Sequence, residues 1–123
     1  SLANPVFVST NNYIHPSVDF DKYLNETINF IKKNKIQYIS FHPRESIFFK
    51  KTIKENFPKI NTFNGFNLED FPFKPDVVAI SSQVCFDLLI DGYNITFVPD
   101  FFPSTYSSLW ISLLKDYLKE LVN

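Results

Sequence analysis

Four polar or turn-forming residues directly follow one apolar run of this sequence. Residues 36–41 are mostly apolar, β-branched or aromatic, and His42, Pro43, Arg44 and Glu45 come next. A helix start presents unpaired backbone N–H groups and the positive end of the helix dipole, so an imidazole there could donate to a phosphate. The alternative is an ordinary corner in which Pro43 occupies the first helical turn, His42 caps it and the two charged residues are solvated.

A pair of hydroxyl side chains occupies a similar position further along the chain. Ser81 and Ser82 follow the apolar run 76–80 and precede apolar residues at helical spacing. Two hydroxyls and the N–H groups of a helix start can bind phosphate oxygens without a lysine. Each serine could equally be an ordinary helix N-cap. If both positions lie at one edge of a sheet, they could bind one phosphate together.

Two further positions are weaker candidates for the same site. Glu69 lies in the irregular segment 64–75, and a carboxylate beside a nucleotide phosphate can accept hydrogen bonds from both ribose hydroxyls. It could also be a solvated loop acid or a local cap. The His-Pro dipeptide occurs earlier as His15-Pro16, but a loop rather than a helix start follows it, so we rank it second.

The elements that must position these residues alternate between strands and helices. Hydrophobic periodicity predicts strands at 6–10, 36–41, 60–63, 76–80 and 94–98, and helices at 20–34, 46–57, 81–92 and 106–122, with one helical turn at 68–70. Asp19 suits an N-cap, and Asn34 and Gly92 suit the left-handed position that ends a helix. The pattern predicts an α/β fold, a Rossmann-like or flavodoxin-like three-layer α/β/α arrangement with a parallel sheet of about five strands. In such sheets ligands bind beyond the carboxyl ends of the strands.

Composition excludes several classes of function. With 123 residues and a net charge of −1, the chain suits a single domain spanning 1–123 and offers no overall field for nucleic acid. The lone Cys85 permits no internal disulfide and no cysteine-based metal site, and we interpret it as a core residue. No apolar run is long enough to span a bilayer. We read Ser1-Leu2 as a candidate cloning remnant, and the chain as a domain of something longer.

Several catalytic and binding motifs are missing from the sequence. Only Gly65 and Gly92 are glycines, so neither the dinucleotide fingerprint nor the P-loop occurs. There is no HExxH motif, no cluster of carboxylates and no G-x-S-x-G elbow. A receiver-type signalling domain needs acidic residues after the first strand and a lysine after the fifth, and this chain has neither.

The order of these motifs resembles the bacterial sialyltransferases of GT-B type, including their lipooligosaccharide and capsule branches. The resemblance covers residues 36–90 and rests on His42-Pro43, Glu69 and Ser81-Ser82. It implies a C-terminal donor-binding domain that holds cytidine monophosphate (CMP) sialic acid without a metal or other cofactor. Departures from the family pattern are Ser40-Phe41 in place of a basic residue before the motif, and the lack of the acidic motif that activates the acceptor.

The resemblance also implies roles for individual residues. It assigns His42 to catalysis at the donor phosphate, as a hydrogen-bond donor or general acid for CMP departure, with Arg44 beside it. Pro43 would shape the loop against cytosine, Glu69 would bind the ribose, and Ser81-Ser82 the phosphate oxygens. The glycan acceptor would bind through an N-terminal domain outside this chain. The implied location is the cytoplasm or the inner-membrane surface, by peripheral association.

Two alternatives to this interpretation stay open. The first is a glycosyltransferase domain that uses another CMP-linked acidic sugar, or a uridine or guanosine diphosphate sugar. The second is a non-enzymatic interaction module with an exposed aromatic patch of Phe101, Phe102 and Tyr106. For these three residues we favour packing in the core at the end of a strand.

Overall fold

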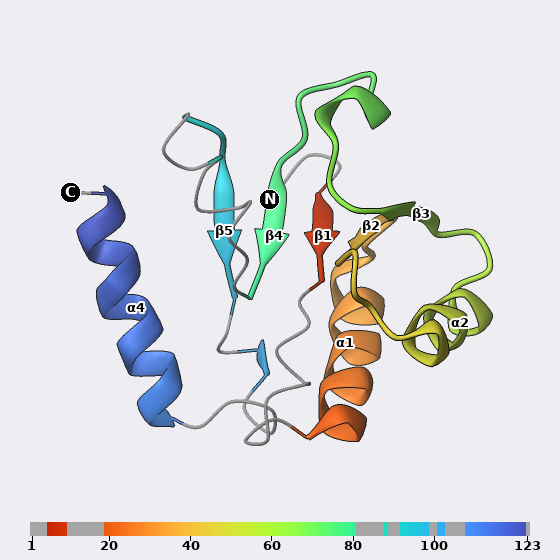
Figure 1. Cartoon of the computed structure of the whole chain (residues 1–123), viewed down its shortest axis with the longest axis horizontal. Coiled ribbons are helices and arrows are strands. Elements are labelled where there is room, and N and C mark those ends of the chain that lie inside the picture. The colour runs from red at the N-terminus through yellow and green to blue at the C-terminus, as the bar shows by residue number, and fades with distance from the viewer. Residues whose placement is uncertain are drawn as a thin grey trace.

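A computed structural model describes residues 5–9, 19–80, 88, 92–98, 101–102 and 108–122 (Figure 1). Its strands are β1 (Val6–Val8), β2 (Tyr38–Phe41), β3 (Asn61–Asn64), β4 (Val77–Ala79) and β5 (Ile95–Phe97). Its helices are α1 (Phe20–Asn34), α2 (Ile47–Asn56), the 3-10 helix η2 (Leu68–Asp70) and α4 (Ser108–Val122). The helical turn predicted at 68–70 is confirmed, and each predicted strand is present in a shorter form or shifted by one residue.

The described strands form one parallel sheet in the order β3-β2-β1-β4-β5. Val8 of β1 pairs in register with Ser40 of β2 on one side and with Ala79 of β4 on the other. The predicted α/β fold with a five-stranded parallel sheet is therefore confirmed. A flavodoxin-like sheet places its second strand at this edge, whereas a Rossmann-like sheet places its third strand there. Since β3 is the edge strand here, the observed order is the Rossmann-like one of the two predicted topologies.

Helix α1 begins and ends where local chemistry favours it. The Asp19 carboxylate accepts the backbone N–H of Lys22 at 3.0 Å, as an N-cap does. At the other end Lys35, not Asn34, adopts the left-handed conformation, with φ 52°. The Asn34 prediction was wrong because Asn34 stays in the last helical turn, where its side-chain amide donates to the Phe30 carbonyl at 3.0 Å.

Helix α2 is capped three residues after Pro43. The Ser46 hydroxyl accepts the Phe49 N–H at 3.2 Å, and the helix then buries Phe49 and Ile53. The Phe49 ring stacks on Tyr23 of α1, with centroids 5.2 Å apart and planes 7° apart. This stacking joins α1 and α2 into one layer over the sheet.

The core is divided between the two faces of the sheet because side chains alternate along each strand. One face carries Phe7, Ile39, Phe41 and Val78, and it packs against the buried faces of α1 and α2. The opposite face carries Val8, Val77 and Ala79, and among the described residues Phe66 of the β3–β4 connection packs against it.

Two predicted helices, at 81–92 and 106–122, are described only in part. The helix predicted to start at Ser81 falls outside the described residues apart from buried Leu88. Its predicted end is supported, because Gly92 has φ 88° and the Tyr93 N–H donates to the Leu88 carbonyl at 3.0 Å, the pattern of a Schellman end. Figure 1 shows α4 beside the edge strand β5, at the opposite edge of the sheet from α2.

Candidate functional site at the carboxyl edge of the sheet

The carboxyl edge, where the strands end, has its topological switch point between β1 and β4. The chain passes from β1 to β2 and β3 on one side and then returns to β4 on the other. Ligands in open α/β sheets bind beyond the strand ends at such a point. Since neighbouring strands lie about 4.8 Å apart, the ends of β2 and β4 are separated by roughly 10 Å, with the end of β1 between them.

The residues after β2 form a closed turn at this edge. The Glu45 N–H donates to the His42 carbonyl at 2.9 Å, which closes a four-residue turn through Pro43 and Arg44. The interpretation that Pro43 starts the helix and His42 caps it is wrong, because Ser46 provides the cap. Pro43 instead sets the backbone of the turn, and its side chain is exposed.

The His42 imidazole is oriented by its own turn. The Arg44 N–H donates to Nδ1 of His42 at 3.0 Å, so Nδ1 carries no proton and the neutral ring carries it on Nε2. Burial, and secondarily the positive charge of Arg44, lower the pKa of His42 below its ordinary 6.5. At neutral pH the side chain therefore offers one N–H donor, and the described residues supply no partner for it.

Arg44 provides a positive charge beside that donor. Its side chain is exposed, and no carboxylate in the described part of the chain forms an ion pair with it. The first turn of α2 follows within three residues and adds the positive end of a ten-residue helix. A neutral donor, a cation and a helix start together suit an anion.

Sequence reasoning missed two residues beneath the turn, Ser9 and Glu45. Ser9 follows β1 and is fully buried; its hydroxyl donates to Oε2 of Glu45 at 2.6 Å and accepts the His42 N–H at 3.0 Å. Glu45 is 6% exposed, so the expectation that it is solvated was wrong. Two features of the sequence could have indicated this pair. Ser9 is a hydroxyl residue at the end of a buried strand, and Glu45 is a carboxyl residue that a turn after the next strand could direct inward.

The structure does not bring Glu69 to His42. Glu69 is exposed on η2, which Figure 1 shows as a short green turn near the end of the sheet where β1 and β4 begin. Phe71 and Phe73, just after η2, contact Tyr38 at the first residue of β2, with centroids 6.2 and 5.6 Å away. The β3–β4 connection has therefore crossed the sheet before it reaches Glu69.

Several predicted site residues lie outside the described part of the chain. These are Ser81, Ser82, His15, Pro16 and Cys85. What is described is the end of β4: Ala79 pairs with Val8 of β1, and Ile80 is fully buried. Ser81 follows Ile80 directly in the sequence. Strands β2 and β4 thus end at the same edge, one strand apart, which is the arrangement that joint phosphate binding requires.

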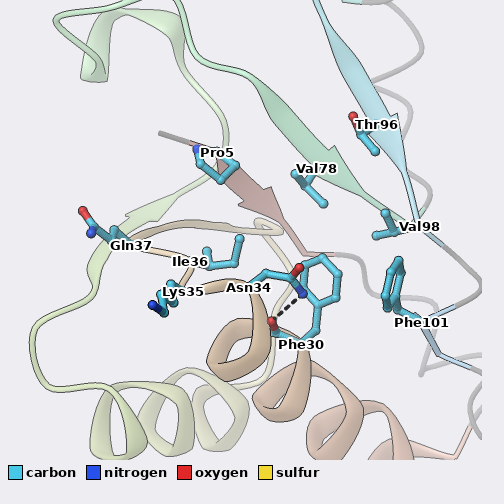
Figure 2. Close-up of a pocket in the computed structure, with 10 residues that line it drawn as sticks. All are labelled: Pro5, Phe30, Asn34, Lys35, Ile36, Gln37, Val78, Thr96, Val98 and Phe101. Atoms are coloured by element: carbon cyan, nitrogen blue, oxygen red, sulfur yellow. Dashed lines mark hydrogen bonds between the residues drawn. The ribbon is translucent and has the colours of Figure 1, made fainter. Parts of the chain in front are cut away.

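A groove of about 470 Å³ lies elsewhere, beside the C-terminal half of α1 (Figure 2). Figure 2 shows Phe30 of α1 facing Val78, Val98 and Phe101 across it. Of the described residues that line it, Phe101 belongs to the alternative aromatic patch, and none belongs to the predicted phosphate site. The apolar walls of the groove offer no charge other than Lys35 at the rim, so it suits an anionic ligand less well than the His42 turn does.

For the three aromatic residues of the alternative patch, the favoured prediction was packing in the core. Phe102 is fully buried and stacks on Phe7 with centroids 6.3 Å apart, which confirms core packing for this residue. For Phe101 the prediction of core packing is wrong, because this residue is 45% exposed, although its ring contacts Phe30 edge-on at 5.4 Å. Tyr106 lies outside the described residues. Since Phe102 is buried, it cannot belong to an exposed patch.

Comparisons of the chain with models of protein families, with curated proteins and with solved structures found no match. Within the described residues, no three histidine, cysteine or carboxylate side chains gather as a metal site would require. No helix in the same part of the chain is both long and apolar enough to cross a membrane.

Proposed function

We propose that this chain is the donor-binding domain of a bacterial glycosyltransferase, an inverting sialyltransferase that uses CMP-sialic acid to modify a surface glycan. One observation carries the proposal: the His42 turn presents an Nε2–H donor and the Arg44 cation together at the carboxyl edge of a Rossmann-like sheet. The motif order His42-Pro43 then Ser81-Ser82 supports the CMP-linked donor. The acceptor domain would lie outside this chain, so we expect donor binding without turnover.

In this proposal His42 acts as a neutral hydrogen-bond donor and not as a general acid. Its Nδ1 already accepts the Arg44 N–H, and its pKa is lowered by burial and by the Arg44 charge. A neutral imidazole is a very weak acid, but it can stabilise the charge that develops on the departing phosphate. Arg44 adds a positive charge for the same oxygens. Ser81 and Ser82 would complete the site from the end of β4.

Calorimetry with CMP, UDP and GDP tests the choice of donor. We expect CMP to bind best, and His42→Ala to weaken it roughly tenfold, the effect of one hydrogen bond of about 1.5 kcal/mol. The double change Ser81→Ala/Ser82→Ala should weaken it as well. Preference for UDP or GDP would indicate another nucleotide-sugar donor, and a folded domain that binds none of the three would contradict the proposal.

Glu69→Gln is the informative control for this experiment. The family resemblance implies a ribose contact for Glu69, whereas its place near the start of the strands implies none. We expect unchanged CMP affinity. A clear loss would show that the β3–β4 connection reaches the carboxyl edge when nucleotide is bound.

A further inference from the structure

We propose that Ser9 and Glu45 are positioning residues that hold the His42 turn in its donor orientation. This inference rests on the proposed function, because it concerns the same phosphate-binding donor. Neither residue would touch the nucleotide. Their role would be to fix the backbone that carries the imidazole, from the end of a different strand.

The direction of each hydrogen bond around Ser9 follows from its single proton. The Ser9 hydroxyl gives its one proton to Oε2 of Glu45, at 2.6 Å. Its lone pairs are then the only group it can offer to His42, whose backbone N–H donates at 3.0 Å. The Ser9 N–H in turn donates to the Ser40 carbonyl at 3.0 Å, which keeps Ser9 in register with β2.

Glu45 closes this arrangement from the other end of the turn. Its backbone N–H donates to the His42 carbonyl while its side chain accepts the Ser9 proton. Both polar backbone groups of His42 are therefore tied to this pair, and Nδ1 is tied to Arg44. Of the hydrogen-bonding groups of His42, Nε2–H is the one directed to none of these partners.

The chemistry of the pair favours positioning over simple packing. An apolar side chain could fill this buried corner without the cost of desolvating a carboxylate. A carboxylate instead fixes the direction of the Ser9 proton, and so fixes which group Ser9 offers to His42. The pair also links the end of β1, at the switch point, to the donor after β2, although the two residues are 36 positions apart.

Ser9→Ala, Ser9→Thr and Glu45→Gln test the role, with Thr27→Val as the matched control. Thr27 is also fully buried, and its hydroxyl donates to the Tyr23 carbonyl at 2.8 Å, away from the His42 turn. The readouts are the tautomer of His42 from long-range ¹H–¹⁵N spectra, the exchange rate of the His42 amide, and CMP affinity by calorimetry.

We expect Ser9→Ala and Glu45→Gln to speed exchange of the His42 amide, to mix the two tautomers and to weaken CMP roughly 3- to 10-fold. Ser9→Thr keeps the hydroxyl and should therefore retain the wild-type amide exchange rate, tautomer and CMP affinity. Thr27→Val should leave the same three quantities unchanged. If Ser9→Ala does not fold, Glu45→Gln keeps the volume and carries the test.

If the tautomer of His42 and the exchange rate of its amide were unchanged in Ser9→Ala and Glu45→Gln, the positioning role would be overturned. Equal effects in Thr27→Val would overturn it as well. The spectra report on His42 whether or not nucleotide binds, so failure of CMP to bind the wild-type domain would contradict the proposed function without deciding this inference. Altered spectra with unchanged CMP affinity would show that the pair fixes the turn but not the binding donor, and would also overturn it.

Discussion

The backbone N–H of Arg44 donates to Nδ1 of His42 at 3.0 Å, which makes the imidazole an acceptor within its turn and leaves its Nε2–H as a donor without a partner among the described residues. The arrangement exists only while His42 is neutral. Protonation of Nδ1 would place two donors face to face and add a positive charge beside Arg44. The turn and the protonation state of His42 are therefore linked.

A first prediction concerns the titration of His42. Because its folded pKa lies below the unfolded value of 6.5, the folded state binds the proton less tightly than the unfolded chain does. The stability that His42 contributes is complete above pH 6.5, and it is lost as the pH falls through the lowered folded pKa. An NMR titration should place His42 below 6.5, and Arg44→Ala should raise its pKa only in part, since burial is the larger cause. A value at or above 6.5 in the wild-type domain would contradict the described turn.

A second prediction concerns the salt dependence that Arg44 gives to nucleotide binding. The side chain is exposed, so its attraction for a phosphate is screened, and we expect Arg44→Ala to weaken CMP by only about two- to fivefold at low salt. At 1 M salt the difference should nearly vanish. Arg44→Lys should lie between the two, because it keeps the charge and loses the planar fork. A loss that persists at high salt would mean that Arg44 is enclosed when nucleotide binds.

A third prediction compares two adjacent phenylalanines of α2. Phe49 is fully buried between Tyr23 and Phe41, whereas Phe48 is 61% exposed. Phe49→Ala should lower the free energy of unfolding by about 3–5 kcal/mol, because it leaves a cavity in the core. Phe48→Ala should change it by less than about 1 kcal/mol, the scale of its ring contact with Phe20. Urea unfolding followed by circular dichroism measures both, with Phe49→Leu as the milder variant if Phe49→Ala does not fold.

Similar costs in the two alanine variants would mean that α2 does not present Phe49 to the core. A marked loss of CMP affinity in folded Phe48→Ala would instead place its exposed ring in the nucleotide site.

The sequence predicted those parts of the fold whose causes are local. The start of helix α1 at Phe20 was predicted correctly, because an N-cap at Asp19 and a regular apolar stripe act within one element, whereas its left-handed end was placed one residue too early. The strand order could not be predicted, since which strands pair depends on contacts between distant segments. The Ser9–Glu45 hydrogen bond was missed for the same reason. Beside Arg44 in the sequence, Glu45 looks like one half of a solvated pair, and only the pairing of β1 with β2 brings Ser9 within hydrogen-bond distance of it.

The candidate site likewise contains one residue whose position could be predicted from the sequence and one whose position could not. The position of His42 at the carboxyl edge was predicted correctly, because a polar residue directly after a strand must lie at the sheet edge in any parallel fold. Glu69 was assigned to the same edge on the assumption that the β3–β4 connection stays there. The connection instead packs Phe66 against the second face and Phe71 near Tyr38, so it crosses the sheet. Aromatic burial decided its path, and no spacing rule in the sequence expresses that.

The last prediction concerns the end of α1, where the expected left-handed residue was misplaced by one position. Lys35 has φ 52° and ψ 45°, a conformation that costs an L-residue with a side chain roughly 1 kcal/mol and glycine almost nothing. Lys35→Gly should therefore raise the free energy of unfolding by about 0.5–1 kcal/mol, even though it removes a side chain and loosens the unfolded chain. Asn34→Gly, one residue earlier, should lower it by about 1 kcal/mol or more, because position 34 is helical and its side chain donates to the Phe30 carbonyl.

Urea unfolding of the two glycine variants measures these opposite effects. Since both introduce the same residue at neighbouring exposed positions, any general effect of glycine on the unfolded state cancels between them. The sign of the difference then depends only on which residue is left-handed. If Asn34→Gly were the stabilising variant, the helix would end one residue earlier than described, and the prediction made from the sequence would be correct after all.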